Sequence, residues 1–188
     1  MKSLKIFCVG GTIDKIYFDA KSKYEIGAPS ISKVLRDHDV VLDYQVVPLM
    51  AKDSLEMTEA DRAEIVSAVS QAVEDKIVIT HGTDTMAATA KELARIRDKT
   101  IVLTGALSPA IFKDSDAIFN IGCAIATAQV AQPGVYIAMN GRVFNHNQVR
   151  KDVSNNRFVP LWNRSIAHTD TGVRCWISIA ANDIRGLS

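Results

Sequence analysis

Short apolar runs rich in valine and isoleucine recur along most of the chain, and longer segments with a helical pattern separate them. These runs do not alternate between apolar and polar positions, which is typical of strands buried on both faces of a parallel sheet. The pattern predicts five such strands: Leu4–Val9, Tyr44–Leu49, Ile77–Thr80, Thr100–Thr104 and Val135–Met139.

Amphipathic helices are predicted between the strands. One begins at Thr58 and extends through Glu74, because a threonine followed three residues later by an acidic residue, here Asp61, forms a capping box. A second helix follows Thr83, a third follows Asp114-Ser115, and a short one is predicted near Ser30–Asp37. In the three longer helices, apolar residues are spaced so that they lie on one helical face, which is expected to point inward. These residues are Ile65, Val69, Ala72 and Val73 in the helix after Thr58, Met86, Ala90, Leu93 and Ala94 in the helix after Thr83, and Ile118, Ile121, Ile125 and Ala128 in the helix after Asp114-Ser115.

The alternation of strands and helices predicts an α/β fold with a doubly wound, mostly parallel sheet flanked by helices. A chain of 188 residues is long enough to bury a large core and is most simply one domain. We assign residues 1–159 to this domain and residues 160–188 to a tail. In the tail only Cys175–Ala180 has the character of a strand.

The chain has 22 basic and 21 acidic side chains and therefore almost no net charge, which argues against a protein that binds nucleic acids or membrane surfaces. No apolar stretch reaches transmembrane length, and the run after Lys2 is too short for a signal peptide, so a cytoplasmic location is expected. The three cysteines are odd in number and far apart, and the histidines lack ligand spacing. Neither a disulfide framework nor a metal site is therefore expected.

Two glycine–threonine turns are the most informative feature. Gly10-Gly11-Thr12 follows the first predicted strand, and His81-Gly82-Thr83-Asp84 follows the third. Because the carboxyl ends of parallel strands face one crevice, both turns are expected to bring a threonine hydroxyl to the same place. Neither turn has the glycine spacing of a phosphate or dinucleotide loop. The pair favours nucleophilic amide chemistry.

Five motifs in order carry a family resemblance. They are Gly10-Gly11-Thr12-Ile13, Lys52-Asp53-Ser54-Leu55-Glu56-Met57-Thr58, His81-Gly82-Thr83-Asp84-Thr85-Met86, Leu103-Thr104-Gly105-Ala106 and Asn140-Gly141-Arg142. Together, over residues 4–158, they resemble the bacterial-type L-asparaginases, whose relatives include glutaminase-asparaginases and an archaeal amidotransferase subunit. The resemblance implies the fold of that family's N-terminal domain. It also implies hydrolysis of L-asparagine to L-aspartate and ammonia without a cofactor.

The resemblance also implies the catalytic residues. Thr12 matches the threonine that attacks the amide carbon, and a tyrosine from the segment after it assists. Tyr17 and Tyr24 both lie in that segment, and Tyr17 is favoured because shorter members of the family place theirs closer. Thr83 and Asp84 match a second catalytic pair, and Lys151 matches the lysine that pairs with that threonine. Which threonine forms the acyl intermediate stays open.

Substrate binding follows from the charges of free asparagine, which carries an ammonium and a carboxylate on one carbon. Asp84 is expected to pair with the ammonium, and Asp53 is a further candidate for it. The Ser54 hydroxyl and nearby backbone N–H groups suit the carboxylate. The turns at Gly11 and Gly82 are expected to contact the substrate and to supply donors for an oxyanion.

Most members of the family are longer and carry a second, C-terminal domain. The sequence is most similar to a short-chain group, and the resemblance therefore implies that this second domain is not expected here. We expect a homodimer or homotetramer, in which a symmetric copy closes the pocket. Two other functions remain open: a non-catalytic amino-acid-binding module and the ammonia-supplying part of an amidotransferase. Taken singly, Thr12 and Thr83 are also ordinary turn and cap residues.

Overall fold

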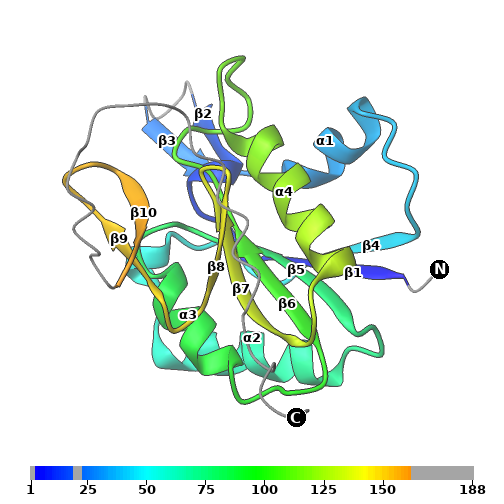
Figure 1. Cartoon of the computed structure of the whole chain (residues 1–188). Helices are drawn as coiled ribbons and strands as arrows, with labels where there is room; N and C mark the ends of the chain where they lie inside the picture. The colour runs from blue at the N-terminus through cyan, green and yellow to red at the C-terminus, as the bar shows by residue number, and fades with distance from the viewer. Residues whose placement is uncertain (1–2, 19–22, 162–188) are drawn as a thin grey trace, which may run out of the picture.

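The computed structural model describes residues 3–18 and 23–161, and its centre is a six-stranded sheet (Figure 1). The strands lie side by side in the order β4-β1-β5-β6-β7-β8, and all neighbours are parallel except β7 and β8. The parallel strands are β1 (Leu4–Cys8), β4 (Tyr44–Pro48), β5 (Lys76–Thr80), β6 (Thr100–Thr104) and β7 (Gly134–Met139). These are the five predicted strands, with ends that differ by one residue at most.

Helices cover both faces of the sheet. The helices are α1 (Ile31–Asp37), α2 (Glu59–Gln71), α3 (Met86–Leu93) and α4 (Ala117–Val130). Ile6 and Val78 point to the side of α1 and α4, whereas Phe7 and Ile79 point to the side of α2 and α3. Since both sets are apolar, each strand reads as a continuous hydrophobic run. The predicted α/β class with a mostly parallel, helix-flanked sheet is confirmed.

The order of the strands creates a switch point. From β1 the chain first adds β4 on one side, and then crosses to add β5, β6 and β7 on the other. In open α/β sheets, ligands bind outside the carboxyl ends of the strands at the point where the order reverses. Here that point lies between β1 and β5, which are the strands that precede the two glycine–threonine turns.

Three short antiparallel elements were not predicted. β8 (Arg142–Asn145) pairs with β7 through a two-residue turn at Asn140 and Gly141, which both have positive φ. An Asn-Gly pair is the standard signal for such a hairpin, so this strand could have been found from the sequence. Two further hairpins stand apart from the main sheet: β2 (Lys15–Phe18) with β3 (Lys23–Ile26), and β9 (Val149–Asp152) with β10 (Arg157–Pro160).

Two predicted core positions are wrong. Val73 is 93% exposed because α2 ends at Gln71, before the predicted end of the helix. Ile118 is 43% exposed although it lies on the same side of α4 as the buried Ile125; it belongs to the first turn, at the end of the helix. The predicted strand Cys175–Ala180 lies outside the described residues, and the predicted domain boundary stays a prediction.

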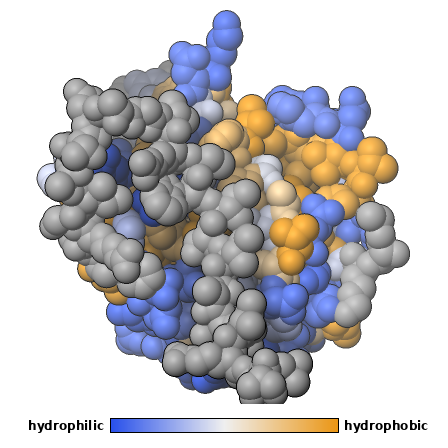
Figure 2. Space-filling model, viewed as in Figure 1, coloured by the Kyte–Doolittle hydropathy of each residue, from blue (hydrophilic) through white to orange (hydrophobic). Residues whose placement is uncertain are grey.

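The outer side of α4 carries no charged residue. Ile118, Phe119 and Val130 are exposed on it, and Figure 2 shows hydrophobic surface gathered over α4. Its buried side holds the polar residue Asn120. Among residues 3–18 and 23–161, no helix is both long and apolar enough to span a bilayer.

Asn120 connects three segments at the carboxyl end of the sheet. Its side-chain amide donates to the carbonyl of Gly105 (3.0 Å) and to the carboxylate of Asp116 (2.8 Å), and its oxygen accepts from the backbone N–H of Asn140 (3.1 Å). Asp116 in turn accepts from the N–H groups of Leu107 and Ser108. The loops after β6 and β7 are thus held to the start of α4.

Substituting Asn120→Ala should therefore lower the free energy of unfolding by about 1–3 kcal/mol, because buried backbone groups lose their partners. Urea unfolding measures the change. Gln129→Ala is the matched control on the same helix, since Gln129 is exposed and bonds only within α4; its effect should stay within about 0.5 kcal/mol. Equal stability of the two variants would contradict this role of Asn120.

Candidate active site

The turns after β1 and β5 lie in direct backbone contact. The strands pair in parallel with Cys8 opposite Thr80, and the N–H of Val9 donates to the carbonyl of Thr80 (3.1 Å). Gly11 has a φ of +94°, and a Cβ at this position would lie 2.4 Å from the Cα of Gly82. No side chain fits between the two turns. The residue that follows each glycine is a threonine, so Thr12 and Thr83 both lie at the switch point.

The loop after β4 packs against the same contact. A Cβ on Gly82 would lie 2.7 Å from the Oγ of Ser54, and the hydroxyl of Thr85 donates to the carbonyl of Ser54 (2.8 Å). Ser54 is only 1% exposed, and its hydroxyl has no hydrogen-bond partner within the described part of the chain. A buried hydroxyl without a partner costs free energy. A ligand that bonds to Ser54 would offset that cost.

Lys151 reaches this site from the β9–β10 hairpin. Its Nζ lies 2.7 Å from the Oγ1 of Thr83 and 2.6 Å from the Oδ1 of Asp84. Val149 and Phe158 of the same hairpin are buried in the core, which fixes the position of β9. An ammonium that donates to a hydroxyl oxygen stabilises negative charge on it. The structure thus brings together three of the predicted site residues.

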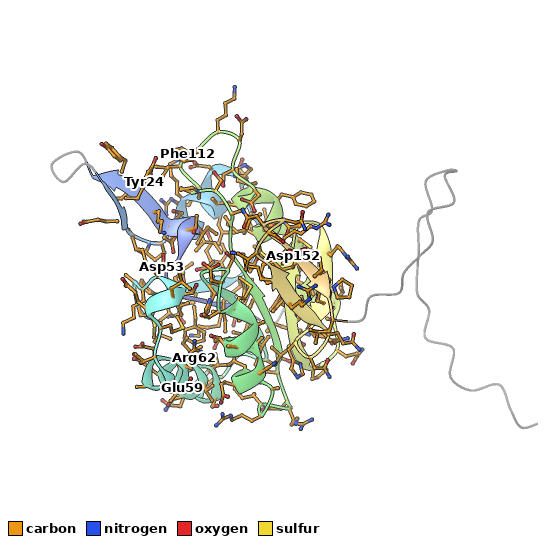
Figure 3. The ribbon with its side chains drawn as sticks, turned by 90° about the vertical axis from the view of Figure 1, so that its left-hand side faces the viewer. Tyr24, Asp53, Glu59, Arg62, Phe112 and Asp152 are labelled. Atoms are coloured by element: carbon orange, nitrogen blue, oxygen red, sulfur yellow. The ribbon has the colours of Figure 1, made fainter. Side chains whose placement is uncertain are left out.

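The predicted tyrosines lie on the β2–β3 hairpin. Tyr17 and Tyr24 are cross-strand partners, with ring centroids 5.5 Å apart in an edge-to-face arrangement. Tyr24 also meets Phe112, at 6.2 Å, and Figure 3 shows these two residues together above Asp53. Both tyrosines are about half exposed. Since they share one level of the hairpin, the structure does not favour one of them over the other.

Asp14 anchors the base of this hairpin and was not predicted. Its carboxylate accepts from the N–H of Ser30 (2.7 Å), and its carbonyl accepts from the N–H of Gly27 (2.8 Å). Asp14 is buried, and burial raises the pKa of its carboxyl. The segment directly after Thr12 is therefore held to the start of α1.

Asp53, a predicted substrate-binding residue, forms an ion pair with Lys15. The Nζ of Lys15 lies 2.9 Å from the Oδ2 of Asp53, while the Oδ1 accepts from the N–H of Leu55. The hydrogen bond from Lys15 lowers the pKa of Asp53. Sequence reasoning missed Lys15, because no local pattern indicates a contact between loops that follow different strands.

The same loop is tied to α2 through Lys52. The Nζ of Lys52 lies 2.6 Å from the Oδ1 of Asp61, and the N–H of Thr58 donates to the other oxygen (2.7 Å). The hydrogen bond from Lys52 is the main cause that lowers the pKa of Asp61 to about 2. The predicted capping box of Thr58 and Asp61 is present, and it helps to hold the loop that carries Ser54.

His81 is hydrogen-bonded to the turn at Gly82, which follows β5. Its Nδ1 lies 2.7 Å from the carbonyl of Gly82, and its Nε2 lies 2.9 Å from the hydroxyl of Thr89. Because a carbonyl only accepts, the proton sits on Nδ1 and Nε2 accepts from Thr89. Burial lowers the pKa of His81 to about 4. The neutral ring acts as a scaffold for the turn.

Cys8, at the end of β1, does not add a reactive thiol to the site. Burial raises the pKa of the Cys8 thiol to about 12, so this side chain is protonated at neutral pH and is a poor nucleophile. Cys8 is buried, whereas Cys123 is only partly so. Among residues 3–18 and 23–161, no three side chains of His, Cys, Asp or Glu lie together as a metal site would require.

Comparison with known proteins identifies the family. The model of the asparaginase N-terminal domain matches residues 3–159. An L-asparaginase from Thermococcus kodakarensis is 32% identical over 155 residues, which are 79% of this chain and 47% of that protein. One component of the glutamyl-tRNA(Gln) amidotransferase of Methanococcus vannielii is 28% identical over 155 residues, 76% of this chain and 35% of that one.

A solved structure agrees in fold. The thermostable L-asparaginase from Thermococcus kodakarensis superposes with a TM-score of 0.74 and 28% identity, over 84% of this chain and 51% of that chain. The chain thus spans about half the length of the asparaginase it matches.

His81 should make the stability depend on pH. Between about pH 6.5 and 4 the unfolded chain binds a proton at this residue that the folded chain does not, so the free energy of unfolding falls as the pH decreases. In His81→Gln this contribution is absent, and less stability should be lost between pH 7 and 5. Urea unfolding at several pH values measures both proteins. Parallel pH curves for the two proteins would contradict the neutral, buried state of His81.

Proposed function

This chain belongs to the asparaginase family, and from its site we propose that it is an amidohydrolase that converts L-asparagine and water to L-aspartate and ammonia. The observation that carries the proposal is the contact of Lys151 with both Thr83 and Asp84, beside the turn that holds Thr12. A hydroxyl oxygen that receives a hydrogen bond from an ammonium is suited to bear negative charge during proton transfer.

In the proposed reaction, the Oγ1 of Thr12 attacks the carboxamide carbon, assisted by Tyr17. Backbone N–H groups of the turns at Gly11 and Gly82 stabilise the oxyanion. Ammonia leaves with the proton taken from Thr12, and an ester remains on the enzyme. Water, activated by Thr83 with Lys151, then cleaves the ester, releases aspartate and restores the Thr12 hydroxyl. In the opposite assignment, Thr83 attacks the carboxamide carbon and Thr12 activates the water, and the same side chains take part.

The substrate's charged head has partners on both sides of this site. Ser54 supplies a buried hydroxyl with no partner within the described residues, which suits a carboxylate oxygen. Asp84 is partly exposed while it accepts from Lys151, which leaves it able to bind an ammonium as well. Charge-assisted hydrogen bonds of this kind fix the amide against the nucleophile. The expected cytoplasmic location and homo-oligomeric assembly stay predictions.

Ammonia release from L-asparagine tests the proposal. Thr12→Ala and Thr83→Ala should each lower kcat by about 10²–10⁴-fold, because each removes a group that takes part in proton transfer or attack. Thr12→Ser keeps the hydroxyl and should retain part of the activity. Thr127→Ala is the control, since this hydroxyl bonds to the carbonyl of Cys123 within α4, away from the site.

The result also separates the alternatives. No ammonia from about 50 mM asparagine, far above the KM of most enzymes, would contradict an enzyme that acts alone. Asparagine binding without turnover would then favour a binding module. Release that requires an added synthetase partner would favour the ammonia-supplying role, to which the amidotransferase relative points.

A further inference from the structure

We propose that the Lys15–Asp53 ion pair determines substrate specificity by binding the charged head of an α-amino acid amide. In this arrangement Lys15 binds the carboxylate together with Ser54, and Asp53 binds the ammonium together with Asp84. The inference rests on the proposed amide hydrolysis and adds Lys15 to the site, a residue for which the sequence motifs assign no role.

The pair lies at the junction of two site loops. Lys15 comes three residues after Thr12 and begins β2, while Asp53 directly precedes Ser54. The 2.9 Å contact therefore joins the loop after β1 to the loop after β4. The Lys151–Asp84 pair joins the loop after β5 to β9, and Figure 3 shows Asp53 and Asp152 of β9 on opposite sides of the molecule's centre. The Gly11–Gly82 contact connects the loop after β1, which leads to Lys15, with the loop after β5, which carries Asp84.

The exposure of the pair suits a small charged ligand. The side chains of Lys15 and Asp53 are 29% and 28% exposed, so solvent reaches them but screens them only in part. Another lysine–aspartate pair, Lys33–Asp37 on α1, is 74% and 47% exposed and lies on the outer surface. An exposed ion pair of that kind contributes little to the stability of the fold. A partly buried pair next to a binding site is instead placed to bind a charged ligand.

The hydrogen-bonding capacity of the pair is not used up by their own contact. An ammonium has three donors, and Lys15 gives one of them to the Oδ2 of Asp53. The Oδ1 of Asp53 accepts from Leu55 at 3.2 Å, and each carboxylate oxygen has a second lone pair. A zwitterion can therefore bind with its carboxylate on Lys15 and its ammonium on Asp53 while the pair stays formed.

Lys15 neutralises the negative charge of Asp53 next to the place where the substrate's carboxylate binds. Without it, the substrate's carboxylate would approach Ser54 next to the unpaired negative charge of Asp53. Two carboxylates repel each other, so the Ser54 hydroxyl alone would bind the substrate's carboxylate weakly. With Lys15, both carboxylates of the site, Asp53 and Asp84, are paired with lysines, and a zwitterion adds no net charge.

Three amides that differ only in their charges test the proposal: L-asparagine, succinamic acid without the ammonium, and β-alaninamide without the carboxylate. Lys15→Met should raise KM about 10–100-fold for asparagine and succinamic acid, the range expected for a lost charged hydrogen bond, and leave that for β-alaninamide unchanged. Asp53→Asn should raise KM for asparagine and β-alaninamide but not for succinamic acid. Lys33→Met is the matched control and should change none of the three values.

A merely structural ion pair would give a different pattern. If either substitution raised KM equally for all three amides, or lowered kcat alone, the specificity role would be wrong. Calorimetric binding of L-aspartate, which has the same charged head, keeps the two proposals distinguishable. Weaker binding of aspartate by Lys15→Met in a protein that releases no ammonia would support the ion pair and contradict amide hydrolysis. Turnover with unchanged selectivity would contradict the ion pair alone.

Discussion

The contact between the backbones of Gly11 and Gly82 is the constraint on which the site depends. A Cβ on Gly11 would overlap the second turn, and a Cβ on Gly82 would overlap Ser54. Three loops after three adjacent strands therefore meet with no side chain between them. The meeting is possible because the strand order reverses between β1 and β5. Thr12, Thr83 and Ser54 lie together as a consequence of this packing and of the sheet beneath it.

The charged groups of the site come from elements outside the main sheet. Lys15 belongs to the β2–β3 hairpin and Lys151 to the β9–β10 hairpin, and each lysine contacts an aspartate of a strand-end loop. Partly exposed ion pairs contribute little to the stability of a fold. The hairpins are instead held by buried residues, by Val149 and Phe158 on one side and by Asp14 on the other. The ion pairs therefore position functional groups on a frame that is stable without them.

The sequence predicted the parts of the fold that local patterns determine. The buried strands are continuous apolar runs, and Thr58 with Asp61 has the spacing of a capping box, so both were found. The strands of the β2–β3 and β9–β10 hairpins have only four residues each, which is too short for a hydrophobic period to be detected. The motifs pointed to Thr83, Asp84 and Lys151, which lie in contact, but the pairing of Lys15 with Asp53 depends on how two loops pack. Tyr17 and Tyr24 face each other across a hairpin, so the choice of Tyr17 rests on the family resemblance and not on the positions of the two rings.

The electrostatics of the site restrict the ligands that fit it. Each aspartate that faces the turns has a lysine within 3 Å, so the site offers both signs of charge at short range and little net charge. A polyanion would meet Asp53 and Asp84, and a simple cation would meet Lys15 and Lys151. A ligand that carries one charge of each sign next to an uncharged amide can pair its carboxylate with Lys15 and its ammonium with the aspartates, and its carboxylate can also bond to the buried Ser54 hydroxyl. The chemistry of a free amino acid amide therefore follows from the arrangement of charges as well as from the threonines.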